Sequence, residues 1–306
     1  MSLIESLLDR TVVFSFDRNG FRRHRRRFRA EDVDVDLTGK TCLVTGASSG
    51  IGFAAAKALA ERGADIRLLC RSRERGLAAA AAIGKRHVSL EEVDVSDLAS
   101  IRAFVKRFRK RRIDVLVNNA GVLVDREIMT AGGLETTLAT NLVGPFLLTE
   151  LLLPKLAGGR VITVSSGGMY TQKLGVRSLV PRPFDGVTAY ARTKRAQVVL
   201  TELWAVRHPG TAFFSMHPGW ADTPSVRTAI PRFWSLTRSI LRTPEEGADT
   251  IVWLAVAPDL ASRSGRFFFD RKAQETVVLP GTKEEPGERE RLWEALVSWS
   301  GLVPVS

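Results

Sequence analysis

Short apolar runs alternate with longer segments in which apolar residues recur at helical spacing. The runs are rich in β-branched residues, as expected of buried strands, and lie at 41–45, 65–70, 87–94, 114–118, 160–165, 211–216 and 265–269. The helical segments between them lie near 50–62, 76–83, 101–108, 133–153, 188–204 and 244–256. Strands separated by helices of this length predict an α/β protein with a doubly wound parallel sheet.

The two ends of the chain differ from this pattern. Residues 1–36 form a basic, amphipathic extension, in which Leu3, Ile4, Leu7 and Leu8 recur at helical spacing before a run of arginines. The extension either packs on the body of the protein or a second subunit, or contacts an anionic membrane through residues 1–30; we favour packing. We therefore predict an N-terminal extension at 1–36, a single domain at 37–275 and a C-terminal tail at 276–306 with a helix around 292–296.

The net charge of +12 is localised. Residues 1–30 hold eight Arg and three acids, and residues 102–112 hold seven basic residues and no acid, so the rest of the 306-residue chain is nearly neutral. Clustered cations suit nucleic acid, but solvated faces are the favoured interpretation. Two cysteines exclude a disulfide framework, and four scattered histidines give no metal-ligand spacing. No uncharged stretch reaches the roughly 18 residues of a membrane span, and no secretory pattern opens the chain. We expect a cytoplasmic protein without a metal site.

A glycine-rich turn carries the first chemical signal. The strand at 41–45 runs into a segment containing Gly46, Gly50 and Gly52, which opens a helix. Glycine lets the backbone turn tightly and lets a pyrophosphate approach, and a helix N-terminus presents free N–H groups to it. A turn between a strand and a helix at this position predicts a Rossmann-type dinucleotide site. A hydrolase is not favoured, because the Gly-x-Ser-x-Gly elbow is absent.

The residue after the second strand indicates which dinucleotide binds. Sites for NAD(H) usually place an Asp or Glu there, whereas this chain has Arg71. A guanidinium is well shaped to hold a ribose 2′-phosphate. The sequence therefore favours NADP(H) over NAD(H), with an ordinary surface arginine as the alternative.

Tyr190 and Lys194 are the candidate acid–base pair. Residues four apart on a helix share one face. A Tyr hydroxyl with a pKa near 10 is a poor acid–base group at neutral pH, and a nearby ammonium lowers that pKa. Ser166 follows the strand at 160–165 and joins the pair as a candidate. Tyr170 is a rival acid, although it lacks a Lys at helical spacing.

The chain resembles the short-chain dehydrogenase/reductase family, and within it the retinol-dehydrogenase-like branch, from about residue 38 to 270. The shared motifs are the turn at 45–52, Asp94, Asn118–Gly121, Asn141, Ser166, the Tyr190/Lys194 pair and Pro218-Gly219 with Thr223. The resemblance implies that Tyr190 is the general acid/base, that Lys194 lowers its pKa, that Ser166 binds the substrate oxygen and that Asn141 holds a water in a proton relay. It also implies a homo-oligomer.

The same resemblance assigns the cofactor contacts. They are Gly46, Ser48, Ser49, Gly50, Ile51, Gly52, Arg71, Asp94, Val95, Asn119, Ala120, Gly121, Tyr190, Lys194, Pro218, Gly219 and Thr223. Two further segments are expected near the substrate. The 24-residue interval from Ser166 to Tyr190 is expected to form a loop that shapes the pocket, and residues 220–243 form either an apolar lid or a plain packed helix.

These features predict an NADP(H)-dependent oxidoreductase that interconverts a carbonyl and an alcohol on an apolar small molecule, with hydride transfer left to the cofactor. Two alternatives remain. A sugar-nucleotide enzyme shares the Tyr/Lys pair but usually has differently spaced glycines. A cofactor-binding scaffold or sensor would use the basic patches to dock to a membrane or a nucleic acid.

Overall fold

The structure, a computed structural model, describes residues 15–303, and an eight-stranded sheet forms its centre. The strand order is β3-β2-β1-β4-β5-β6-β7-β8. The strands are β1 (Thr41–Thr45), β2 (Asp65–Cys70), β3 (Val88–Glu92), β4 (Val115–Asn118), β5 (Arg160–Val164), β6 (Ala212–Met216), β7 (Phe267–Phe269) and β8 (Lys272–Gln274). The predicted doubly wound parallel sheet is confirmed. The three-residue strand β8, which pairs antiparallel with β7 at the edge, was not predicted from the sequence.

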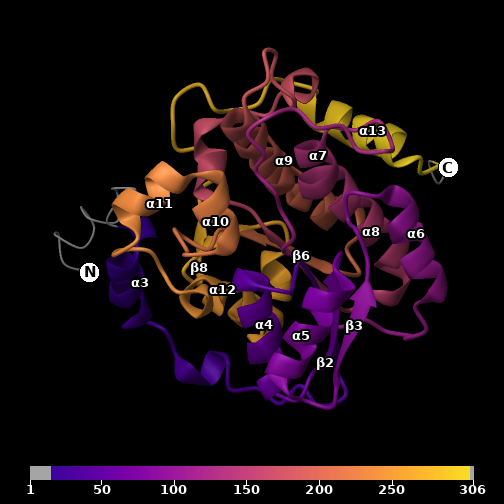
Figure 1. Cartoon of the computed structure of the whole chain (residues 1–306), viewed down its shortest axis with the longest axis vertical. Helices are drawn as coiled ribbons and strands as arrows, with labels where there is room; N and C mark the ends of the chain where they lie inside the picture. The colour runs from indigo at the N-terminus through magenta and orange to yellow at the C-terminus, as the bar shows by residue number, and fades with distance from the viewer. Residues whose placement is uncertain (1–14, 304–306) are drawn as a thin grey trace.

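Helices cover both faces of this sheet (Figure 1). On one face lie α4 (Gly50–Glu61), α5 (Arg73–Ile83) and α12 (Pro244–Val256). On the other lie α6 (Leu98–Arg107), α8 (Gly144–Leu152), α9 (Gly186–Arg207) and α13 (Glu288–Ser300). Each face is covered because strands such as Thr41–Thr45 are buried at every residue and need apolar cover on both sides.

The helix predicted near 133–153 is divided into three parts. It consists of α7 (Thr136–Leu138), a π-helical turn over Ala139–Val143, and α8. This stretch extends to Lys155 and is the one helical segment, among the residues that the structure describes, long and apolar enough to cross a membrane. It is 78% buried inside the fold, as expected of a core helix.

The described part of the N-terminal extension packs on the body of the protein. Asp17 is the N-cap of helix α3 (Arg18–Arg25), and its side chain accepts a hydrogen bond from the Gly20 N–H at 2.7 Å. Phe16 and Phe21 are buried, with 9% and 2% of their surface exposed. Packing, the favoured interpretation, therefore describes this part. The predicted apolar stripe at Leu3, Ile4, Leu7 and Leu8 lies outside the described residues.

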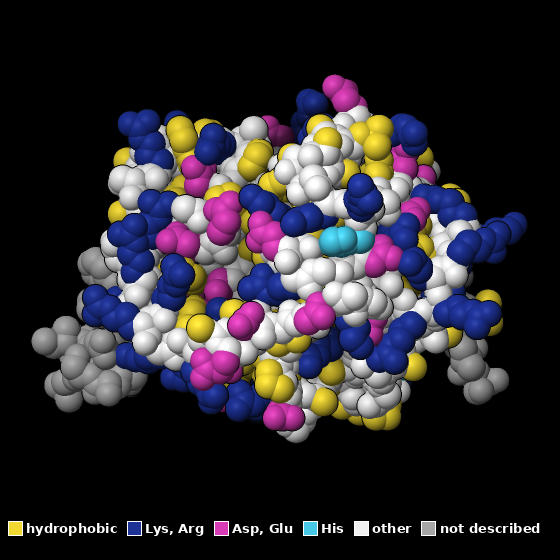
Figure 2. Space-filling model, turned by 90° about the horizontal axis from the view of Figure 1, so that it is seen from below, with side chains coloured by type: hydrophobic (Ala, Val, Ile, Leu, Met, Phe, Trp, Pro, Cys, Tyr) yellow, Lys and Arg dark blue, Asp and Glu magenta, His cyan; other side chains and the backbone are white. Residues whose placement is uncertain are grey.

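Most of the basic side chains at 102–112 have partners. Figure 2 shows Lys and Arg side chains spread over one face of the molecule with Asp and Glu among them. The contacts join Arg102 to the carbonyls of Ser300 and Gly301, Arg107 to Glu91, Lys110 to Asp65 and Arg112 to Asp114. This mixed surface agrees with a solvated face better than with a continuous nucleic-acid footprint.

Candidate active site

A cavity of about 560 Å³ lies beyond the carboxyl ends of the parallel strands, where the loops after β1 and β4 diverge. Such a crevice forms where the strand order reverses, and it is the usual ligand site of an open α/β sheet. Ser166, Tyr190 and Lys194 line it. So do all of the predicted cofactor residues: Gly46, Ser48, Ser49, Gly50, Ile51, Gly52, Arg71, Asp94, Val95, Asn119, Ala120, Gly121, Pro218, Gly219 and Thr223. Asn141 does not.

The glycine turn has the backbone geometry that a dinucleotide needs. Gly46 and Gly50 have φ of +64° and +59°, where side chains are strained. A Cβ on Gly46 would lie 3.0 Å from the Cα of Ala120. Helix α4 begins directly after this turn, and its N-cap, Ser49, makes no side-chain cap hydrogen bond. The first N–H groups of α4 can therefore serve a phosphate.

Thr45 and Asn119 join this turn to the end of β4. The Thr45 hydroxyl oxygen accepts hydrogen bonds from the N–H groups of Asn119 and Ala120 at 3.0 and 2.9 Å. The Asn119 side-chain amide donates to the Thr45 carbonyl at 2.9 Å. The loop after β1 and the loop after β4 are thus joined by hydrogen bonds of the Thr45 and Asn119 side chains.

A basic corner lies at the end of β2. Arg71, Ser72 and Arg75 line the cavity there, and the Arg71 side chain is 67% exposed. Its Nε lies 3.9 Å from a carboxylate oxygen of Asp94. Arg75, one helical turn past Ser72, was not predicted from the sequence to lie here. Two guanidinium groups beside one carboxylate give this corner a net positive charge, which suits a phosphate.

Ser166, Tyr190 and Lys194 converge from two elements. Ser166 follows β5, whereas Tyr190 and Lys194 lie one turn apart on α9, with the Lys194 ammonium 5.3 Å from the Tyr190 ring centre. The Lys194 Nζ also donates to the Val164 carbonyl at 2.7 Å. Ser165 also lines the cavity, but its hydroxyl already donates to the Lys194 carbonyl at 2.8 Å. Ser166 is therefore the serine left beside Tyr190.

Burial sets the acidity of this pair. It raises the pKa of the Tyr190 hydroxyl, and a hydrogen bond with Ser166 lowers it by less. Burial also lowers the pKa of Lys194 to about 7. The sequence suggested a lowered pKa for Tyr190, whereas the structure gives a raised one, because removal from water disfavours the charged form of both groups.

Asn141 lies next to the cavity and connects the loop after β4 to α9 by hydrogen bonds. Its side-chain oxygen accepts from the Val122 N–H at 2.8 Å, and its amide donates to the Val122 carbonyl and the Thr193 hydroxyl. Its own carbonyl accepts from Gln197 at 2.5 Å. The side chain lies in the π-helical turn and is completely buried. The structure thus gives Asn141 contacts to protein groups and no place on the cavity wall.

Tyr170, the rival acid, lies outside the cavity. Its ring packs against Phe16, His217 and Phe267, with ring centres 6.5, 6.3 and 5.9 Å away. Burial raises the pKa of its hydroxyl far above the ordinary value. Tyr190 lines the cavity and Tyr170 does not, so Tyr190 is the tyrosine that a ligand in the cavity can reach.

The expectation for the 167–189 loop is wrong. No residue of that segment lines the cavity. Met169, Leu174 and Leu179 are buried in the core instead, and the Val176 N–H donates to Glu288 on α13 at 2.7 Å. The loop turns toward the C-terminal helix because its apolar side chains find cover there.

The 220–243 segment does form an apolar wall. It contains α10 (Pro224–Ala229) and α11 (Pro231–Thr237). The side of this segment that lines the cavity consists of Trp220, Ala221, Thr223, Pro224, Val226, Ala229, Ile230 and Phe233. Thr136 and Thr140 line the cavity as well, and the sequence analysis missed both, although Thr140 directly precedes Asn141.

Comparison with known proteins agrees with this geometry. A family model described as short chain dehydrogenase matches residues 40–232. Human dehydrogenase/reductase SDR family member 12 is 43% identical over 293 residues, which cover 92% of each chain. Mouse retinol dehydrogenase 11 is 38% identical over 283 residues, which cover 88% of this chain and 89% of that protein. A crystal structure from Beutenbergia cavernae, assigned as an NAD(P) dependent gluconate 5-dehydrogenase with NADP bound at low occupancy, is 26% identical with a TM-score of 0.61, over 76% of this chain and 95% of that chain.

Proposed function

Because the chain belongs to the short-chain dehydrogenase/reductase family of oxidoreductases, we propose that it is an NADP(H)-dependent enzyme that interconverts a carbonyl and an alcohol on an apolar small molecule. The observation that carries the proposal is the convergence of Ser166, Tyr190 and Lys194 on a cavity that also contains the glycine turn. A retinoid or a similar apolar aldehyde is the substrate class that the retinol dehydrogenase relatives suggest.

The cofactor would lie along the carboxyl ends of β1, β2 and β4. The N–H groups at the start of α4 would hold its pyrophosphate, and Arg71 with Arg75 would hold a 2′-phosphate. A bound nicotinamide would supply the hydride for reduction or accept it in oxidation. The remaining work, which is orientation and proton transfer, falls to side chains of this protein.

Tyr190 would donate a proton to the carbonyl oxygen during reduction. Its raised pKa keeps the hydroxyl protonated at neutral pH, as a donor must be. Ser166 would hold the same oxygen by a hydrogen bond, and a protonated Lys194 would stabilise the tyrosinate that forms. The apolar wall formed by Trp220, Ile230 and Phe233 would exclude water and bind the body of the substrate.

Mixing the purified protein with NADPH or NADH and a panel of aldehydes and ketones tests this function. We expect NADPH to be oxidised by apolar aldehydes, seen as a fall in absorbance at 340 nm with a saturated aldehyde and as conversion of all-trans-retinal to retinol by chromatography, and we expect NADH to react more slowly. Tight binding of NADPH without oxidation across the panel, together with binding to anionic vesicles or DNA, would favour the scaffold or sensor instead.

A further inference from the structure

Arg242, which the sequence analysis did not single out, is one of the largest completely buried side chains, with 1% of its surface exposed. It lies just before α12, and its guanidinium faces the carboxylate of Asp270 through two hydrogen bonds of 2.6 and 2.9 Å. The rings of Phe21 and Phe269 lie 5.2 and 4.9 Å from the guanidinium carbon. A bidentate pair with this geometry fixes both side chains in orientation.

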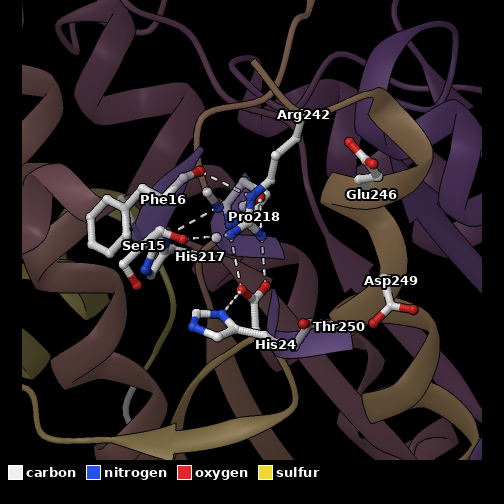
Figure 3. A network of polar contacts seen from close by, with 12 residues as sticks. Ser15, Phe16, His24, His217, Pro218, Arg242, Glu246, Asp249 and Thr250 are labelled. Atoms are coloured by element: carbon white, nitrogen blue, oxygen red, sulfur yellow. Dashed lines mark hydrogen bonds and ion pairs between the residues drawn. The ribbon is translucent and has the colours of Figure 1, made fainter. Parts of the chain in front are cut away.

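The remaining donors of Arg242 reach two other segments (Figure 3). Nε donates to the carbonyls of Phe16 and Asp17 at 2.9 and 3.1 Å, and Nη2 donates to the carbonyl of Ser15 at 3.0 Å. Nη1 reaches the Pro218 carbonyl at 3.4 Å. The guanidinium thus joins the N-terminal extension, the cavity wall and the turn between β7 and β8.

The backbone of Arg242 fixes the same wall from its other side. Its N–H donates to the Trp220 carbonyl at 2.7 Å, and its carbonyl accepts from the Asp222 N–H at 2.9 Å. The Trp220 N–H in turn donates to the Phe16 carbonyl at 2.8 Å. Gly219, with φ of +73°, lies so close to the guanidinium that a Cβ there would collide with it. The 218–222 segment is therefore held by Arg242 along its length.

His24 and His217 flank the pair. His24 Nδ1 lies 2.6 Å from Asp270, and burial together with the Arg242 charge lowers the pKa of His217 to about 3. His217 is therefore neutral, and its Nδ1 accepts the Gly219 N–H at 3.1 Å. His24 therefore shares the Asp270 carboxylate with Arg242, and neutral His217 adds no charge beside the pair.

We propose that Arg242 is a positioning residue of the candidate site. It is anchored by Asp270 and by the carbonyls of residues 15–17, and it holds the 218–222 segment of the cavity wall in place. Residues 15–17 of the N-terminal extension therefore contribute to the shape of the site. The proposal rests on the proposed function, because it assumes that this wall contacts the cofactor. Arg242 itself does not line the cavity and touches no reacting atom.

The test compares Arg242→Lys with Arg232→Lys, a matched change at an exposed arginine of α11. Lysine keeps the charge beside Asp270 but lacks the fork that reaches four carbonyls. We expect Arg242→Lys to weaken NADPH binding roughly tenfold, the effect of losing about one charge-assisted hydrogen bond. We also expect faster amide hydrogen exchange at 219–222 with unchanged exchange in β1. Asp270→Asn should act in the same direction, and Arg232→Lys should leave both measurements unchanged.

A purely structural role predicts a different result, in which exchange accelerates throughout the sheet while the folded protein binds NADPH normally. That result, or wild-type exchange at 219–222 in a folded Arg242→Lys protein, would overturn the proposal. The exchange measurement needs no cofactor, so it separates this proposal from the proposed function. A wild-type protein that bound neither NADPH nor NADH would instead refute the function.

Discussion

Burial of ionisable side chains dominates the chemistry of the site at the scale of single residues. Burial raises the pKa of Tyr190 and lowers that of Lys194 to about 7, although the sequence alone suggested that Lys194 would lower the pKa of Tyr190. The sequence shows that the two lie on one helix face, but it does not show how far the surrounding structure buries each of them. Spacing predicts proximity, whereas acidity depends on the surrounding structure.

Lys194 should make stability depend on pH. Its pKa of about 7 in the folded protein lies below the ordinary 10.5, so between these values the unfolded chain binds a proton that the folded chain does not. Its contribution to the free energy of unfolding should therefore rise with pH from about 7 to 10.5, by at most about 1.4 kcal/mol per pH unit. Urea unfolding of wild type and Lys194→Met across this range measures the difference, and parallel curves would refute the shift.

Arg71 should decide the cofactor preference. Arg71→Asp removes the guanidinium proposed to hold the 2′-phosphate and adds a charge that repels it, so the ratio of kcat/KM for NADPH over NADH should fall roughly tenfold or more. Arg73→Asp is the matched control, because Arg73 is exposed and does not line the cavity. If the ratio of kcat/KM for NADPH over NADH were the same in wild type and Arg71→Asp, Arg71 would not hold the 2′-phosphate.

At the scale of elements, the direction in which a segment packs decides its part in the site. The 167–189 loop and the 220–243 segment both carry apolar residues, yet only the second lines the cavity. Helix α13 accounts for much of this difference, because it lies across α8 and α9 and receives the 167–189 loop through Glu288. Such contacts join segments that lie far apart in the sequence, so no local pattern of residues predicts them.

Phe233 in α11 should contribute to substrate size selection. Its ring packs at 5.2 Å from that of Trp220 in the apolar wall. Phe233→Ala should raise KM roughly tenfold for a long apolar aldehyde and much less for a short one, because it removes apolar contact only where the longer chain lies. Leu236→Ala is the control, since that side chain is 84% exposed on the same helix. An equal change of KM for both aldehydes would argue against a role of the apolar wall in substrate size selection.

Helix α13 should be an integral part of the fold. Leu296 is completely buried in it, so Leu296→Ala should lower the free energy of unfolding by about 2–5 kcal/mol. Glu294→Ala, at an exposed position of the same helix, should change it by less than about 0.5 kcal/mol. Chemical denaturation compares the two, and a stable Leu296→Ala protein would show that α13 is only loosely attached.

At the scale of the whole molecule, the sequence predicted what local patterns encode. Buried β-branched runs and amphipathic helices repeat along the chain, so the parallel sheet followed from them, and the strand–glycine–helix turn indicated where the crevice would lie. The Arg242 cluster could not be found in this way, because its members come from residues 15–24, 218, 242 and 270. Strand β8 could not be predicted either, because three residues are too few to show an alternation of apolar and polar side chains.

Tyr190 is proposed to transfer the proton in an NADPH-dependent carbonyl reduction. A single-turnover experiment measures this step by mixing enzyme that holds bound NADPH with an apolar aldehyde, for wild type, Tyr190→Phe and Tyr170→Phe. We predict that wild type and Tyr170→Phe oxidise the bound NADPH, while Tyr190→Phe binds NADPH normally and reacts at least about 100-fold more slowly. If Tyr190→Phe oxidised its bound NADPH at the wild-type rate, another group would have to supply the proton.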